Sequence, residues 1–514
     1  MMHLQTLVFR NNLIDIIEES EFRGLRSLQI LDLSQNYIKK LPSNLFEEQN
    51  KLRIFLASHN TIESLPRTLF STTVLEQLDL SYNSITEFPT ESLLEIKETL
   101  QSLELTGNKI KSFNFSHIES LQHLRHLSIA KNRIFLPGEA RKFKLPKLIS
   151  LDISHNIIEE VPQWIINSLP NSLESLNFAN TSLISVPVLE PNNILFLNLS
   201  LNNIQTIQSE AFEHLKKLQV LDFSNNLLQN IHNNVWSHLH NLRSLYLQSN
   251  PIQAIQENSF RNMERLQELI IKNLKVQDIQ KAAFQRLTAL RRIEMDLYSK
   301  LKNIDVSQLL QKNNGLREIH LHIEDKKFQG LDGSIPKSVK SVVLEGGNLK
   351  HIDESALTNL QTPNLKLDIR NTNLLTLSRN MFYTMNEVKN FTASFKNNKL
   401  QTVERIPTTF EKGAQSQLQQ LELSGNQLHC DCQLAWIWEW IREYDYQHSC
   451  SDINCAQFSI DDLREAKCVN MNKSFIDAFK TDLDCFSNGA QGFIPYNYLT
   501  FTVVILSIYV KRFI

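Results

Sequence analysis

A single pattern of apolar and polar positions returns along most of this chain. Leu28, Leu31 and Leu33 are followed by Asn36 in the order L-x-x-L-x-L-x-x-N, and 18 such copies lie mostly 23 to 26 residues apart. In the L-x-L core the side chains alternate, which predicts a short β-strand with one buried face. Because one such strand cannot bury its own face, neighbouring copies must stack into a parallel sheet over a continuous core.

The copies differ mainly in the residue that closes the pattern. An Asn here is expected to bond the backbone of the turn and to form a ladder between coils. Copies that end in Asn do so at Asn12, Asn36, Asn60, Asn83, Asn108, Asn132, Asn156, Asn202, Asn226, Asn250, Asn398 and Asn426. The others end at Thr181, Leu274, Tyr298, Glu324, Gly347 and Thr372. Two interpretations of the segment from Leu274 to Thr372 stay open: drift without function, or a change of curvature or docking site.

The pattern and its spacing resemble the leucine-rich repeat family over residues 4–428. The resemblance implies an α/β solenoid, in which residues 1–428 form a curved horseshoe with a parallel sheet on its concave face. Phe212, Phe260 and Phe284 recur at the repeat period and resemble the phenylalanine spine of the extracellular subtype. Their recurrence favours core packing over an aromatic ligand site.

All six cysteines lie between Cys430 and Cys485, in a segment that we assign as residues 429–486. The C-x-C motif precedes a Trp-rich helix and resembles the C-terminal cap of extracellular leucine-rich repeat proteins. Trp436, Ile437 and Trp440 fall on one helical face and are expected to cover the open end of the solenoid.

Six cysteines allow 15 disulfide connectivities. The family resemblance implies Cys430–Cys455 and Cys432–Cys485, with Cys450–Cys468 as an extra bridge. Zinc is the competing interpretation of C-x-C, but histidines at ligand spacing are missing from the sequence, so no metal is expected.

The two ends of the chain suggest a membrane-anchored fragment. The first repeat begins at Leu4 without a signal peptide or N-terminal cap, so we expect that upstream repeats are missing. Residues 487–514 hold a polar spacer and an apolar tail that resemble a glycolipid-anchor signal, with Ser487, Asn488 or Gly489 as attachment candidates. The alternative is a transmembrane helix followed by a stop-transfer flank.

Five sequons predict N-glycosylation at Asn114, Asn180, Asn198, Asn390 and Asn472. Asn198 lies between Leu197 and Leu199, so its side chain should project from the concave face. A glycan there is expected to keep protein ligands off that part of the face.

Charge and motifs exclude several classes of function. Lys and Arg number 53 against 55 Asp and Glu, without a basic block along the sequence, so a nucleic-acid partner is not expected. We find no motif for catalysis or for a cofactor. Acidic residues at outward strand positions either form an acidic binding face or reflect ordinary repeat usage; they are Asp32, Asp79, Glu104, Asp152, Asp222 and Glu422.

Repeats, cap and tail together resemble the chaoptin family of cell-adhesion proteins. This resemblance implies a non-enzymatic protein on the extracellular face of the plasma membrane that binds a protein partner, for which a second copy on an opposing cell is one candidate. The alternative is a recognition receptor that resembles the ectodomain of Toll-like receptors. A secreted matrix or inhibitor protein is a third interpretation.

Overall fold

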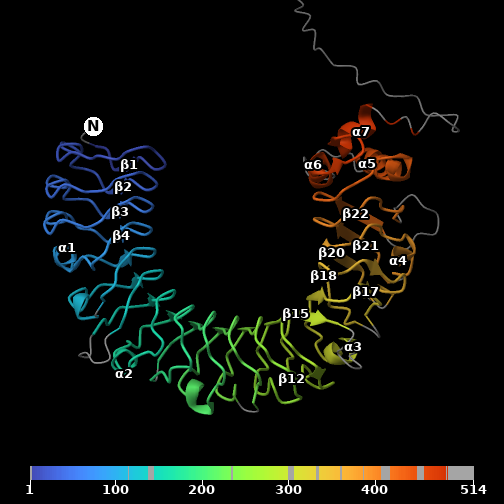
Figure 1. Cartoon of the computed structure of the whole chain (residues 1–514), viewed down its shortest axis with the longest axis horizontal. Helices are drawn as coiled ribbons and strands as arrows, with labels where there is room; N and C mark the ends of the chain where they lie inside the picture. Colours follow the sequence, from blue (N-terminus) through green and yellow to red (C-terminus); the bar gives the residue numbers. More distant parts are fainter. Residues whose placement is uncertain are drawn as a thin grey trace, which may run out of the picture.

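The chain forms a horseshoe-shaped solenoid with its first coil at one tip and the cysteine-rich cap at the other (Figure 1). This computed structural model describes residues 3–485 except 114, 137–143, 191, 233–234, 299–305, 332–334, 359, 361, 386, 407–416, 448–456, 482 and 484. Strands line the inner side of the horseshoe, and short helices lie on its outer side. The expected α/β solenoid is therefore confirmed.

A parallel sheet of 18 strands forms the concave face. Each strand pairs with the next one along the chain, for example Ile30 with Ile54 and Ile54 with Gln77. The strands are β1 (Thr6–Val8), β2 (Ile30–Asp32), β3 (Ile54–Leu56), β4 (Gln77–Asp79), β5 (Ser102–Glu104), β6 (His126–Ser128), β7 (Ser150–Asp152), β8 (Ser175–Asn177), β9 (Phe196–Asn198), β10 (Val220–Asp222), β11 (Ser244–Tyr246), β13 (Glu268–Ile271), β15 (Arg292–Leu297), β16 (Glu318–Ile323), β18 (Ser341–Gly346), β20 (Asn364–Thr372), β21 (Asn390–Ser394) and β22 (Gln417–Glu422).

The return half of each coil carries short elements. Two-residue strands pair between coils, β12 (Ala254–Ile255) with β14 (Asp278–Ile279) and β17 (Lys327–Phe328) with β19 (His351–Ile352). The helical turns are α1 (Thr90–Leu94), η1 (Phe115–His117), α2 (Gln163–Ile166), η2 (Ser209–Phe212), α3 (Val306–Leu310) and α4 (Asn380–Tyr383).

The closing Asn residues form the expected ladder. Asn226 donates from Nδ2 to the carbonyl of Leu199 in the preceding coil (2.8 Å) and to that of Phe223 in its own coil (3.1 Å). Its Oδ1 accepts from the backbone N–H of Ile204 (3.1 Å). The same contacts to the previous coil recur at Asn36, Asn60, Asn83, Asn108, Asn132, Asn156, Asn202, Asn398 and Asn426. Each Asn thus satisfies buried backbone groups of two coils.

The recurring phenylalanines lie in the core. Phe212, Phe260 and Phe284 are at most 1% exposed. Phe260 and Phe284 of successive coils pack with their ring centroids 5.9 Å apart. The prediction of core packing is confirmed.

The C-terminal cap closes the last coil. It contains η3 (Cys432–Leu434), α5 (Ala435–Gln447), α6 (Gln457–Glu465), the hairpin of β23 (Lys467–Cys468) and β24 (Lys473–Ser474), and α7 (Phe475–Thr481). Trp436, Ile437 and Trp440 of α5 are at most 5% exposed, and Trp436 Nε1 donates to the carbonyl of Val403 (3.1 Å). The expected apolar face of this helix is therefore confirmed.

The disulfides differ from the pairing that the family resemblance implied. Cys432 bonds to Cys485 as implied, but Cys430 bonds to Cys468, so Cys430–Cys455 and Cys450–Cys468 are wrong. The cause is the position of the β23–β24 hairpin. Cys468 forms a parallel β-bridge with Leu428 of the last coil, and the Val469 N–H donates a hydrogen bond to the Leu428 carbonyl (2.8 Å). This register brings the Cα atoms of Cys430 and Cys468 to 5.3 Å. Cys450 and Cys455 lie outside the described residues.

Candidate binding surface on the concave face

The concave face has two regions that differ in strand length. From β1 to β11 the strands have three residues, whereas β15, β16 and β18 have six and β20 has nine. At about 3.3 Å per residue, a six-residue strand spans twice the width of a three-residue one. The wide region coincides with the copies from Leu274 to Thr372 that lack the closing Asn.

Opposite charges alternate across the wide region. The strand register places Arg292 between Glu268 of β13 and Glu318 of β16. The guanidinium of Arg292 lies 3.3 Å from the carboxylate of Glu268 and 3.6 Å from that of Glu318. Because neighbouring parallel strands lie about 4.8 Å apart, side chains in register are within reach of one another.

Two glutamates enclose a buried histidine at the centre of these charges. His320 on β16 is 4% exposed, with Nδ1 at 3.4 Å from Glu294 Oε2 and Nε2 at 3.4 Å from Glu345 Oε2. Glu294, at 5% exposure, also contacts Lys272 Nζ at 2.5 Å. Arg370 Nε lies 3.3 Å from Glu345. Each buried carboxylate therefore has at least one cationic partner besides the imidazole.

The partners of these carboxylates set their pKa values. Burial alone raises the pKa of Glu294, but hydrogen bonds from His320 and Lys272 outweigh it and bring the pKa to about 2. Burial also raises the pKa of Glu345, and the charges of His320 and Arg370 reverse that effect, so its pKa is lowered. Both side chains are ionised at neutral pH and hold their basic neighbours in place.

The same pattern continues to the cap. Arg370 Nη1 lies 3.3 Å from Asp368 on β20, whose pKa is raised by burial. Lys396 contacts Glu422 of β22 (3.4 Å) and Asp462 of α6 (3.2 Å). Asp462 also accepts from the backbone N–H of Ser424 (3.0 Å), so one carboxylate fastens the cap to the last strand.

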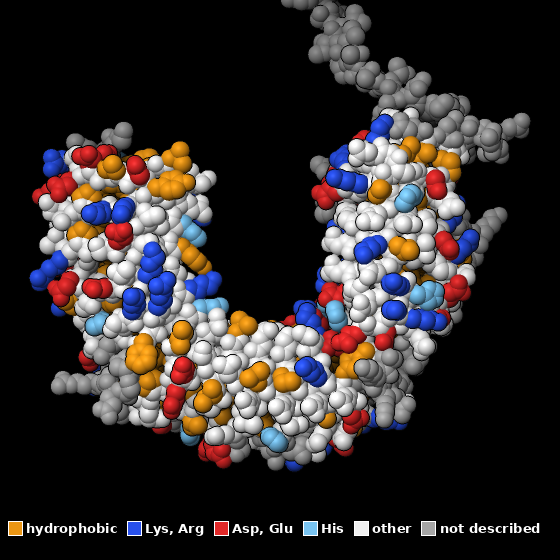
Figure 2. Space-filling model, viewed as in Figure 1, with side chains coloured by type: hydrophobic (Ala, Val, Ile, Leu, Met, Phe, Trp, Pro, Cys, Tyr) orange, Lys and Arg blue, Asp and Glu red, His pale blue; other side chains and the backbone are white. Residues whose placement is uncertain are grey.

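Cations form the outer layer of this surface. The side chains of Lys272, Arg292 and Arg370 are 38–40% exposed, while Glu294 and Glu345 beneath them are 5% and 17% exposed. Of the paired carboxylates, Glu318 reaches a similar exposure, 36%. Figure 2 shows acidic and basic side chains gathered on the inner side of the bend, near β15 in Figure 1.

We call this group the concave ion network. Its members are Glu268, Lys272, Arg292, Glu294, Glu318, His320, His322, Glu345, Asp368 and Arg370. Cations that buried carboxylates hold in place lose little conformational entropy on binding, so Lys272, Arg292 and Arg370 are ordered before any partner arrives.

The first ten coils present a different concave face. Four of the outward aspartates accept a hydrogen bond from the backbone N–H two residues later, at 2.8 to 2.9 Å. These are Asp32, Asp79, Asp152 and Asp222. Such local bonds favour ordinary repeat usage for the individual residues, although their charges still make this part of the face acidic.

Glu104 lies among those acidic residues. Burial and the nearby charges of Asp79 and Asp152 together raise its pKa to about 7. Cross-strand hydroxyls lie beside it, with Thr106 Oγ1 and Ser128 Oγ 2.5 Å apart. This part of the concave face therefore gains negative charge as the pH rises through neutrality.

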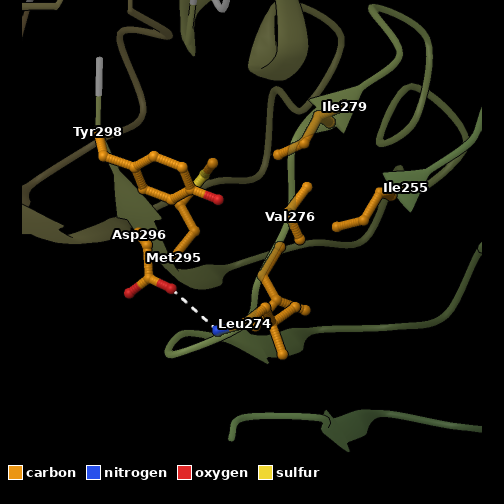
Figure 3. A pocket seen from close by; sticks show the side chains of 8 residues that line it. Ile255, Leu274, Val276, Ile279, Met295, Asp296 and Tyr298 are labelled. Carbon is orange, nitrogen blue, oxygen red and sulfur yellow. Dashed lines mark hydrogen bonds between the residues drawn. The ribbon is translucent and has the colours of Figure 1, made fainter. Parts of the chain in front are cut away.

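A small cavity lies where the Asn ladder breaks (Figure 3). Its volume is about 10 Å³, and its lining includes Ile255, Val276 and Tyr298. Asp296 Oδ2 accepts from the backbone N–H of Leu274 (3.1 Å), where a closing Asn would otherwise bond. Space for about one water is too small for an organic ligand, so this cavity is a packing feature of the irregular coils.

The described sequons occupy different environments. Asn198 is half-buried on β9, and its Oδ1 accepts from the Ser200 N–H (2.9 Å). Asn390 on β21 donates from Nδ2 to Asn364 (3.1 Å), so its amide nitrogen is engaged between strands. Asn180 and Asn472 are exposed. Asn114 lies outside the described residues.

The structure describes none of the proposed anchor residues Ser487, Asn488 and Gly489. Within the described ranges, every helix is too short or too polar to cross a bilayer.

Comparison with known proteins identifies the repeats. A family model described as leucine rich repeat matches residues 2–62, 196–252 and 241–296, and a second model of the same description matches residues 74–95. The chain is a leucine-rich repeat protein. It is similar to chaoptin from Tribolium castaneum, with 31% identity over 72% of this chain and 49% of that protein. Chaoptin from Drosophila melanogaster is 28% identical over 80% of this chain and 35% of that protein.

Solved structures share the fold. The mouse RP105/MD-1 complex contains a chain that matches 91% of this leucine-rich repeat protein with a TM-score of 0.59 and 18% identity, covering 81% of its own length. A leucine-rich repeat protein of Leptospira interrogans matches 60% of the chain, and 83% of its own length, with a TM-score of 0.51 and 26% identity. This leucine-rich repeat chain spans about half or less of the length of the two chaoptins.

The sequence pattern did not predict the concave ion network. Its members lie about one repeat apart, for example Glu294, His320 and Glu345, so no local motif reveals them. Aligning the repeats in register and reading down each outward column would have shown the alternation of charge.

Proposed function

We propose that this leucine-rich repeat protein is a non-enzymatic cell-surface adhesion protein that binds a second copy of itself on an opposing cell. The observation that carries the proposal is the charge difference between the two parts of its concave face. The acidic part contains Asp79, Glu104 and Asp152, and the cationic layer contains Lys272 and Arg370. An antiparallel pair of horseshoes would bring these opposite charges together.

Similarity to chaoptin supports this function, because it covers 72% of the chain and agrees with the adhesion role that the sequence suggests. The extracellular face of the plasma membrane is the proposed location. Cap disulfides support it, since disulfides persist in oxidising compartments.

Anchoring through residues 487–514 is part of the proposal, with Ser487, Asn488 or Gly489 as the attachment site of a glycolipid. Treatment of expressing cells with a phosphoinositide-specific phospholipase tests it. Release of the protein is expected, whereas retention on the cells would favour a transmembrane helix.

A cell-mixing assay tests homophilic adhesion. The chain is expressed behind a signal peptide in non-adherent cells, which are labelled and mixed with unlabelled cells that lack it. Clumps made of expressing cells alone are expected. Surface display without clumps would contradict adhesion by this chain, and clumps that recruit the unlabelled cells would indicate recognition of a different surface protein.

A further inference from the structure

Cations from two successive coils meet on the lateral face of the N-terminal limb. Lys109 and Lys111 are exposed on either side of buried Ile110, and Arg133 and Phe135 flank buried Ile134 in the next coil. The Arg133 N–H donates to the Ile110 carbonyl (2.9 Å), so the cations of both coils lie side by side. Figure 2 shows several basic side chains gathered on the N-terminal limb, on the face turned to the viewer.

Lys131 is a further exposed cation beside this group, and its ammonium contacts Tyr82, which is part of an aromatic stack. Tyr82 lies against Gly107 and stacks on His59, with ring centroids 4.5 Å apart. Lys131 Nζ lies 3.3 Å from Tyr82 Oη and 5.7 Å from the ring centroid. Gly107 makes this possible, because a Cβ there would lie 2.7 Å from Tyr82 Cδ1. Tyr82 thus positions the Lys131 ammonium on the same face as Lys109 and Arg133.

The cations of this lateral basic patch (Lys109, Lys111, Lys131 and Arg133) contrast with those of the concave ion network. Lys109 contacts the hydroxyl of Ser84 (3.0 Å) and Lys131 that of Tyr82, and no carboxylate within the described ranges lies within ion-pair distance of the four. Along the chain, the nearby exposed acidic residues include Glu87 in the preceding coil, Glu119 between the two coils and Glu159 in the following coil. Four uncompensated cations in two coils create a local positive potential.

We propose that this lateral basic patch binds a sulfated polysaccharide. Adjacent coils repeat at about 4.8 Å, so the cations form a short row along the solenoid that can contact several sulfates of one linear chain. Side chains with hydrogen-bonding groups continue this row in both directions, namely His59, Tyr82, Ser84, His155 and Asn180. Such groups suit sugar hydroxyls better than the acyl region of a lipid surface. This binding is independent of the proposed adhesion and uses a different face.

Retention on immobilised heparin tests the proposal. The whole chain, expressed behind a signal peptide and purified in mild detergent, is compared with a variant that carries Lys111→Glu, Lys131→Glu and Arg133→Glu. A matched control carries Lys216→Glu, Lys217→Glu and Lys350→Glu, three exposed lysines outside the patch. Equal thermal unfolding temperatures of the three proteins verify that the substitutions leave the fold intact.

The patch variant is expected to bind heparin at least about tenfold more weakly than wild type and control, because three attractions become repulsions. Binding of the wild type should also weaken with added salt. Equal retention of the patch variant, or no retention of the wild type, would overturn the proposal. Competition by phosphatidylserine vesicles or by poly-glutamate as strong as that by heparin would overturn the assignment to a sulfated glycan.

Discussion

Two glutamates on the concave face show how one side-chain type takes opposite roles at the residue scale. Glu294 is buried among cations, and its pKa falls to about 2. Glu104 is half-buried near Asp79 and Asp152, and its pKa rises to about 7. The first carboxylate stabilises the fold when it is ionised, and the second destabilises the fold when it is ionised.

Replacing Glu294 with Gln is expected to destabilise the protein at pH 7 by on the order of 2–3 kcal/mol. A lowered pKa gives stability that is present above the unfolded value of 4.5 and lost as the pH falls through about 2. The difference between wild type and variant should therefore shrink between pH 4.5 and pH 2. Denaturant unfolding at several pH values measures it, and a difference independent of pH would contradict the assignment.

Replacing Glu104 with Gln is expected to stabilise the protein at alkaline pH, which is opposite to the effect of replacing Glu294. A raised pKa gives stability that is present below 4.5 and lost as the pH rises through about 7. The variant should match wild type near pH 4 and exceed its stability at pH 8 by on the order of 1 kcal/mol, after allowance for solvent screening. Thermal unfolding across this range provides the measurement. A variant that is less stable than wild type at pH 8 would show that the carboxylate is needed in its ionised form.

At the scale of elements, the sequence predicted what repeats locally and missed what depends on register between coils. The L-x-L cores, the Asn ladder through Asn226 and the buried face of α5 follow from patterns within one repeat. The long strands β15 to β20 do not, because their extra residues pair only once neighbouring coils are stacked. The cap disulfide through Cys468 depends likewise on a hairpin bridge to Leu428 that no cysteine spacing encodes.

Removing the Cys430–Cys468 bridge tests the role of the cap as a closing element. The bridge spans 38 residues, and a double change to Ser is expected to destabilise the cap by about 4 kcal/mol through the gain in unfolded-chain entropy. Limited proteolysis should then cleave the segment after Cys430 faster than in wild type, while the coils around Asn226 stay protected. Simultaneous loss of protection in both regions would show that the cap and coils unfold as one unit.

At the scale of the whole molecule, the horseshoe separates three charged surfaces. The acidic part of the concave face lies on strands from β2 to β10, the concave ion network lies from β13 to β20, and the lateral basic patch lies in the coils that begin with β5 and β6. The net charge of the sequence indicates none of these three surfaces, because 53 basic and 55 acidic residues almost cancel. Only the curvature and stacking of the coils assign each charge to a face.

Charge reversal in the cell-mixing assay tests homophilic contact most directly. One cell population carries Lys272→Glu with Arg370→Glu, and the other carries Asp79→Lys with Glu104→Lys. Each population alone is expected to clump less than wild type, because two like-charged surfaces then meet. Mixed clumps of the two populations should form again, since the reversed charges are complementary. Two populations that both clump like wild type, or a mixture that stays dispersed, would contradict contact between these parts of the concave face.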